Sequence, residues 1–351
     1  MAERLVESVP NVSEGRRLDV VERIADAVIA TPGVHLLDRT SDPDHNRSVL
    51  TLAGEAGAVA DALEAMTGVA LAEIDMERQS GQHPRIGAVD VIPFVPLGST
   101  TMAEAVEIAR AFGRRLAATY HLPVYFYAEA ATRPDRVKLA DVRRGQYEGL
   151  KLEIGQRGRE PDAGPARIHP TGGATAVGAR PFLVAWNIDL DSDDLEVAKR
   201  IARRVRESSG GLPRVQAAGF MIAERGRAQV SMNLLDTART PMWRVWDEVA
   251  ELATEEGVRP AASELIGLAP LAAFLEVADH AGAAADAPTE ARFAAAATYL
   301  RLMEPDPMMA LELRLSAARR GGATDAPSTA EVDHATADPA GPAGDDPGPD
   351  G

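Results

Sequence analysis

Residues 81–96 read GQHPRIGAVDVIPFVP and join a histidine to the clearest strand of the chain. The apolar run at 89–95 predicts a buried β-strand. His83 precedes this strand, and Pro84 restricts its own φ while favouring an extended backbone at His83. The imidazole is therefore expected at a rigid strand entrance. A histidine with a pKa near neutrality can both accept and donate a proton in that position.

The first half of the chain alternates apolar strands with amphipathic helices around this segment. The strands are expected at 5–9, 34–38, 48–53 and 89–95, and the helices at 18–30 and 58–72. This order, β-α-β-β-α-β, is that of a ferredoxin-like unit. A long helix at 102–120 and a short strand at 123–127 follow. Residues 150–180 are rich in Gly and Pro without periodicity, so they predict a long functional loop.

The second half repeats the same order from residue 181. Its strands are expected at 182–188, 215–223, 228–236 and 263–268, its helices at 193–207 and 241–256, and closing helices at 271–277 and 289–303. The sequence therefore predicts an α/β protein (an α+β sandwich) of two tandem ferredoxin-like subdomains, at 1–180 and 181–315. Residues 320–351 are acidic and poor in apolar bulk, which predicts a disordered tail.

Composition limits the classes of function. The net charge of −16 argues against nucleic acid as a partner. The absence of cysteine excludes disulfides, thiol catalysis and cysteine-ligated zinc, and fits a cytoplasmic protein. A signal peptide and an uncharged apolar stretch of about 18 residues are both missing, which argues against a membrane association. A metal site is not expected, because the chain has no HExxH or paired His/carboxylate helix face.

Residues 81–96 resemble the HPR-x-GA-x-DV-x-PF-x-P signature of the glutamate formimidoyltransferase (formiminotransferase) family. Further stretches resemble that family in the same order. They are VPNVSEG at 9–15, LLD at 36–38 with NRSV at 46–49, Gly164-Pro165 with GATAVGAR at 173–180, and QVSMNLLD at 229–236. The matches cover roughly residues 1–315. The chain is identified as a member through its transferase part, and no cyclodeaminase domain is expected after it.

The resemblance implies that the protein transfers the formimino group of N-formimino-L-glutamate to tetrahydrofolate, giving 5-formimino-tetrahydrofolate and glutamate in histidine degradation. It also implies a folate groove between the subdomains, tetrahydrofolate as co-substrate without a metal, and a cytoplasmic homodimer. Two alternatives remain. One is a relative that uses 5-formyl-tetrahydrofolate as a cycloligase or formyltransferase, although no nucleotide loop supports ATP use. The other is a non-catalytic folate-binding protein.

The resemblance places proton transfer on His83, because N5 of the acceptor must lose a proton and the leaving glutamate nitrogen must gain one. It places folate binding on ten consecutive residues: Gly164, Pro165, Ala166, Arg167, Ile168, His169, Pro170, Thr171, Gly172 and Gly173. The animal enzymes have an aromatic residue where Gly172 stands here. Polar contacts from Arg167 and His169 are therefore expected in place of ring stacking, or His169 only solvates the loop.

Several other polar residues are weaker candidates. Arg85 is considered for a substrate carboxylate, and Asn11, Asn46 and Asn233 for hydrogen bonds to the ligand. The remaining histidines are interpreted as strand, turn, helix-end or tail residues without a catalytic role; they are His35, His45, His121, His280 and His334. The small residues of 172–178 are interpreted as letting the backbone approach a flat pterin ring.

Overall fold

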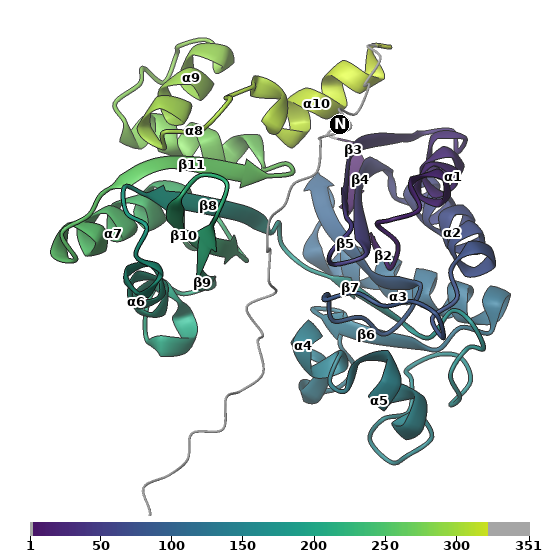
Figure 1. The fold of residues 1–351 in the computed structure, drawn as a ribbon. Helices are drawn as coiled ribbons and strands as arrows, with labels where there is room; N and C mark the ends of the chain where they lie inside the picture. The colour runs from purple at the N-terminus through teal and green to yellow at the C-terminus, as the bar shows by residue number, and fades with distance from the viewer. Residues whose placement is uncertain (1–2, 322–351) are drawn as a thin grey trace, which may run out of the picture.

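The first unit is built on the predicted alternation of strands and helices. The computed structural model describes residues 3–321, which form two α/β units side by side (Figure 1). The strands of the first unit are β1 (Arg4–Ser8), β2 (Asn11–Val12), β3 (Val34–Asp42), β4 (Arg47–Glu55), β5 (Val89–Gly98), β6 (Val124–Ala128) and β7 (Thr175–Ala179). Its helices are α1 (Leu18–Ile29), α2 (Ala56–Glu73), α3 (Met102–Tyr120), α4 (Leu139–Val142) and α5 (Gln146–Glu153).

These strands form one seven-stranded sheet. Strands β1 and β2 are two pieces of a strand interrupted at Pro10, which has no backbone N–H to donate. Both pieces lie between β4 and β5 and pair antiparallel with each, while β3 pairs with the far side of β4. The order β3-β4-β1-β5 with its two helices confirms the predicted ferredoxin-like unit. Strand β7 then extends the sheet, parallel to β5 on one side and β6 on the other.

The prediction of a long loop over 150–180 is therefore wrong at both ends. The end of α5 reaches Glu153, and residues 175–179 form the buried strand β7. The small residues there are packed closely against other parts of the protein. A Cβ atom on Gly178 would collide with the Tyr127 ring, and one on Gly87 would collide with the carbonyl oxygen of Ala174. Strand β7 consists mostly of small residues, so its sequence shows no alternation of large apolar and polar side chains that would predict a strand.

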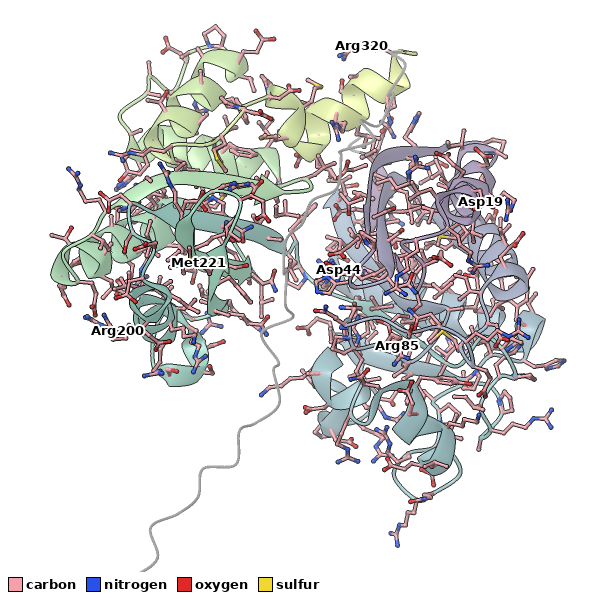
Figure 2. All side chains as sticks on the ribbon, in the orientation of Figure 1. Asp19, Asp44, Arg85, Arg200, Met221 and Arg320 are labelled. Atoms are coloured by element: carbon pink, nitrogen blue, oxygen red, sulfur yellow. The ribbon has the colours of Figure 1, made fainter. Side chains whose placement is uncertain are left out.

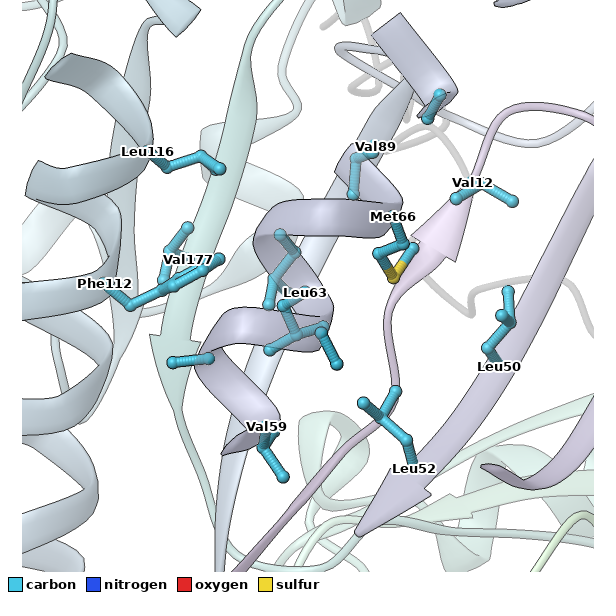
Figure 3. Close-up of a cluster of buried hydrophobic side chains, with 14 of the residues drawn as sticks. Val12, Leu50, Leu52, Val59, Leu63, Met66, Val89, Phe112, Leu116 and Val177 are labelled. Atoms are coloured by element: carbon cyan, nitrogen blue, oxygen red, sulfur yellow. The ribbon is translucent and has the colours of Figure 1, made fainter. Parts of the chain in front are cut away.

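Helices α1, α2 and α3 cover one face of this sheet and enclose the first core. Helix α2 contributes Val59, Leu63 and Met66, which lie at helical spacing and are fully buried. They pack in one cluster with Leu50 of β4 and Val177 of β7, as Figure 3 shows. On the opposite face of the sheet, the described residues form no such helical layer along its middle. Helices α4 and α5 cover one end of it.

The second unit confirms the second predicted repeat. Its elements are β8 (Val184–Leu190), α6 (Leu195–Val205), β9 (Val215–Ile222), β10 (Arg227–Leu234), α7 (Met242–Glu255) and β11 (Pro260–Ile266). The sheet order β11-β8-β10-β9 is antiparallel throughout, as in a ferredoxin-like unit. Trp186 and Trp246 stack in its core with ring centroids 6.1 Å apart. Helices α8 (Leu271–His280) and α9 (Thr289–Tyr299) follow as expected.

Helix α10 (Leu311–Arg319) was not predicted, and it returns from the second unit to the first. Leu311 and Leu315 pack on Leu5, Leu37, Ala53 and Leu97 of the first sheet. Arg314 Nη1 donates to the carbonyl oxygen of Leu37 at 2.9 Å. The predicted subdomain end at 315 lies inside this helix. Of the predicted tail 320–351, residues 320 and 321 end α10, and 322–351 lie outside the described residues.

We expect the Leu315→Ala variant to lower the free energy of unfolding by about 2–5 kcal/mol, because a Leu side chain only 4% exposed would leave a cavity. Urea denaturation measures this change. The matched control is Leu152→Ala, whose side chain is 79% exposed and should be nearly neutral. Equal stability of the two variants would show that α10 does not pack on the sheet in solution.

Candidate active site

The segment before β5 brings His83 onto the face of the first sheet that α1, α2 and α3 leave uncovered. The backbone N–H of Gln82 donates to the carbonyl oxygen of Asp44 at 3.2 Å, which fixes the segment against the β3–β4 turn. Figure 2 shows Asp44 at the edge of the first unit that faces the second. His83 therefore lies beside His45, with their ring centroids 6.1 Å apart.

The His83 ring is 5% exposed and has a charged group near each nitrogen. Its Nδ1 lies 3.4 Å from Nη1 of Arg47, at the start of β4. Its Nε2 lies 4.0 Å from Oδ2 of Asp90, in β5. Guanidinium groups donate and do not accept hydrogen bonds, so the Arg47 contact assigns the lone pair to Nδ1 and the hydrogen to Nε2. The basic nitrogen of this tautomer is Nδ1.

Asp90 is the buried anchor of the site. It is 1% exposed, and its Oδ1 accepts a hydrogen bond from the backbone N–H of Ile86 at 2.8 Å. Its Oδ2 is ion-paired with Nη2 of Arg143, the residue that ends α4. The carboxylate thus fixes the backbone between His83 and β5, and it orients the Nε2 side of the ring.

Burial lowers the pKa of His83 well below the ordinary 6.5, and the positive charges of Arg47 and Arg143 lower it further. The ring is therefore neutral at pH 7 and can accept a proton. The expectation of a pKa near neutrality is wrong for this structure. Arg47 and Arg143 are distant from His83 along the chain, so no local pattern indicates that they lie next to the ring.

We expect the Cε1–H resonance of His83 to show no titration between about pH 5 and 8. A lowered pKa keeps the folded state unprotonated below pH 6.5, whereas the unfolded chain takes up a proton there. The His83 contribution to stability is consequently lost as the pH falls below 6.5. NMR titration, with His83→Gln used to assign the resonance, measures this pKa. A midpoint near 6.5 would contradict the arrangement described.

Only one end of the predicted folate loop contacts the segment that carries His83. The carbonyl oxygen of Gly172 accepts from the N–H of Ala88 at 2.9 Å, and Gly173 is bridged to Gly87. The other end, at 164–167, is mostly exposed and begins beside β6. His169 is turned inward on its own loop, because its Nδ1 accepts from the N–H of Gly172 at 2.9 Å. The role of 164–173 in folate binding stays a prediction.

Arg85 does not have the role considered for it. Its Nε donates to Gln79 Oε1 at 2.7 Å, and its two terminal nitrogens donate to Glu148 at 2.7 and 3.0 Å. Further bonds to Gln146 Oε1 and to the carbonyl oxygen of Gln79 occupy the remaining N–H groups. Arg85 therefore fastens the His83 segment to α5, and no donor is left for a substrate carboxylate.

The weaker asparagine candidates are divided between the two units. Asn46 bonds through its side chain to the N–H of Gly15 at 3.0 Å and the carbonyl of Ser80 at 2.9 Å, which is a structural task. The side chain of Asn11 donates to the carbonyl of Val9 at 3.2 Å. Asn233 lies in β10 of the second sheet.

Sequence reasoning missed most of the neighbours of His83. His45 was interpreted as a turn residue, yet it is buried, with Nδ1 2.7 Å from Oδ2 of Asp42. Arg47 and Arg143 come from separate parts of the chain. One signal was available for Asp90, because a single carboxylate within an otherwise apolar strand needs a buried partner.

Two further properties follow from residues 3–321. None of the helices there is both long and apolar enough to cross a membrane. In the same range, no three His, Asp or Glu side chains are placed so that they could hold a metal ion.

The fold and site together define a class: an α/β protein of two ferredoxin-like units with a buried histidine that can transfer protons. Comparison with known families specifies it. Residues 5–180 match the description "Formiminotransferase domain, N-terminal subdomain", and residues 185–286 match "Formiminotransferase domain". The chain belongs to the formiminotransferase family, and it is a transferase.

Curated relatives agree with this assignment. The chain is 41% identical over 277 residues to "Glutamate formimidoyltransferase" of Streptococcus pyogenes serotype M1, covering 79% of this chain and 93% of the relative. It is 44% identical over 278 residues to the protein of that name from Thermoplasma acidophilum, covering 79% and 91%. "Formimidoyltransferase-cyclodeaminase" of Rattus norvegicus is 42% identical over 281 residues, covering 78% of this chain and 52% of the relative. The chain thus spans about half the length of that longer relative.

Proposed function

We propose that this protein transfers the formimino group from N-formimino-L-glutamate to tetrahydrofolate, giving 5-formimino-tetrahydrofolate and glutamate in histidine degradation. Membership in the formiminotransferase family supports the reaction class. The observation that supports the chemistry is the neutral, buried imidazole of His83, which lies beside the carboxylate of Asp90. Such a ring is ready to accept the proton that the attacking nitrogen must lose.

The reaction proceeds in two steps at one carbon. N5 of tetrahydrofolate attacks the amidine carbon, forming the new N–C bond while Nδ1 of His83 takes the N5 proton. The bond from that carbon to the glutamate nitrogen then breaks, and the imidazolium returns the proton to the leaving nitrogen. Asp90 stabilises the imidazolium between the steps through its carboxylate near Nε2. A general acid–base group in this role contributes about 10²–10⁴ in rate.

The arginines near His83 fit the charge of the donor substrate. N-formimino-L-glutamate carries two carboxylates, and Arg47 and Arg143 bring positive charge next to the ring. A carboxylate paired with this charge offsets part of the field that lowers the pKa of His83. Donor binding therefore raises the pKa of the ring and makes its acid form accessible for the second step. The pKa of His83 thus suits both proton transfers, the uptake from N5 and the return to the glutamate nitrogen.

The remaining features of the function belong to the same proposal. Folate binds in a groove between the two units, with residues 164–173 as part of its site, and the active form is a cytoplasmic homodimer. Gly172 and Gly173 support this placement, since they adjoin the segment before β5 that carries His83.

A two-substrate assay tests the function. Purified protein with N-formimino-L-glutamate and tetrahydrofolate should release glutamate and form 5-formimino-tetrahydrofolate in equal amounts, both measured by mass spectrometry. Omission of either substrate should abolish both products. A protein that binds reduced folate without forming either product would be a folate-binding protein and not a transferase. Turnover only with 5-formyl-tetrahydrofolate would favour the alternative transferase activity.

A further inference from the structure

Strand β1 places the carboxyl group of Glu7 on the face of the first sheet that α1, α2 and α3 leave uncovered. Glu7 is two residues after Leu5, and Leu5 packs under α10 on that face. Because side chains two residues apart in a strand point to the same side, Glu7 lies on that face too. Glu7 is 4% exposed, and among residues 3–321 its side chain has no hydrogen bond or ion pair. Burial raises its pKa to about 7, although the charge of Arg180 opposes this shift.

The other buried carboxylates of the described chain each have a partner. Asp38 lies 3.6 Å from Arg314, and the remaining three are bonded to an arginine side chain; they are Glu14 with Arg17, Asp90 with Arg143 and Asp189 with Arg225. An unpartnered buried acid costs stability and serves no contact within the fold. Among the described residues, Glu7 is the buried carboxylate that differs from these in having no hydrogen bond or ion pair, as is typical of a group that contacts a ligand.

The strand register places Glu7 at a fixed distance from the His83 site. On β5, Glu7 is opposite Val95, and Asn11 is opposite Val91, the neighbour of Asp90. Four residues of strand separate these positions, which is about 13 Å. The side chains of β4 and β5 between them on this face are Thr51 and Pro93, and both are uncharged. An uncharged strip of sheet thus connects the lone carboxyl group to His83, and its side chains are covered in this structure.

We infer that Glu7 binds the amino-oxo edge of the pterin ring of the reduced folate while His83 acts at its N5. The inference rests on the proposed function. That edge presents two parallel N–H donors, from N3 and the exocyclic amine, which match the two oxygens of one carboxylate as a guanidinium does. N5 lies on the opposite ring, so the fused rings with a hydrogen bond of about 3 Å at each end fit the separation. The ring lies against Thr51 and Pro93 between the two units.

Binding measurements with the Glu7→Gln variant test this inference. We expect the affinity for 5-formyl-tetrahydrofolate, a stable reduced folate, to fall about 10- to 100-fold, because an amide cannot accept two hydrogen bonds from the ring edge at full strength. The affinity for p-aminobenzoyl-glutamate, which lacks the pterin, should stay unchanged. Glutamine has the shape of glutamate, and thermal unfolding verifies the fold. Glu7→Asp keeps the charge but shortens the reach, and it should also lose affinity.

The pH dependence provides a second readout that a structural role would not change. The carboxylate form of Glu7 is the acceptor, so the affinity of the unaltered protein for 5-formyl-tetrahydrofolate should rise as the pH increases through about 7. The charged groups that face Glu7 are Arg180, after β7, and Glu312 of α10; the adjacent strands offer only Ala53 and Val95. The Glu7→Gln variant should lose this rise.

The control is Glu55→Gln, an exposed acid at the end of β4, which should leave folate affinity and turnover unchanged. Unaltered binding of 5-formyl-tetrahydrofolate by the Glu7→Gln variant would overturn the inference. So would a higher KM for N-formimino-L-glutamate with an unchanged KM for tetrahydrofolate, because the carboxyl group would then bind the donor amidine. Failure of the proposed function can be told apart from failure of this inference, because the unaltered protein would then show no turnover.

Discussion

The His83→Ala variant should lose about 10²–10⁴ in kcat and retain nearly all of its affinity for 5-formyl-tetrahydrofolate. The reason is that the proposed mechanism assigns proton transfer at N5 to His83, whereas the inferred binding contact of the pterin is at Glu7, about 13 Å away along the sheet. Steady-state kinetics with both substrates measures kcat, and titration calorimetry measures the affinity. Loss that appears in KM alone, or equally in binding and turnover, would contradict the assigned role.

His45→Ala is the matched control for this experiment. It removes a second buried imidazole within 6.1 Å of His83, but that ring is engaged by Asp42 and has no assigned proton to transfer. Its kcat should fall much less than that of His83→Ala. A comparable loss in the two variants would mean that the pair of histidines acts as a unit.

The Arg143→Met variant should lower the free energy of unfolding by about 3–5 kcal/mol, because Asp90 would remain charged and buried without its main partner. Urea denaturation with a folded baseline measures this loss. The variant should also raise the pKa of His83, since one of the positive charges that lower it is removed. NMR titration of the same resonance tests the second expectation.

Two controls separate the buried charge from a general effect of losing an arginine. The double variant Asp90→Asn with Arg143→Met removes both charges and should recover part of the lost stability. Arg204→Met breaks an ion pair with Glu255 on the surface and should change stability little. A loss for Arg143→Met no larger than for Arg204→Met would show that Asp90 is not stabilised by this pair.

Both ferredoxin-like orders could be predicted because their elements carry strong local signals. Helix α3 was predicted with its observed bounds. In the structure its start is defined by a capping box of Thr101 and Glu104, in which the N–H of Thr101 donates to Glu104 Oε2 at 2.9 Å. Strand β7 and helix α10 depend on tertiary contacts. Ala176 and Gly178 have too little bulk for a periodic pattern, and Leu311 and Leu315 become a buried pair only against the first sheet.

The candidate site was less predictable than the fold. His83 could be identified through its motif and the rigid backbone around Pro84. The groups that lower its pKa could not be predicted, because Arg47 and Arg143 are distant from His83 along the chain and lie near it only in the folded protein. Glu7 in a short strand is typical of a solvent-facing position. It is buried here because its side of the sheet is enclosed, which no local pattern indicates.

The position of β7 between β5 and β6 has a consequence for the order of folding. A ribosome releases residues 89–98 and 124–128 well before residues 175–179, yet these two earlier strands are joined in the sheet only through the later one. Until Ala179 has emerged, β5 has an unpaired edge, and β6 lacks the strand with which it pairs in the described structure. The nascent chain therefore exposes a hydrophobic strand edge for dozens of residues of synthesis, which makes this interval the one most open to aggregation or chaperone binding.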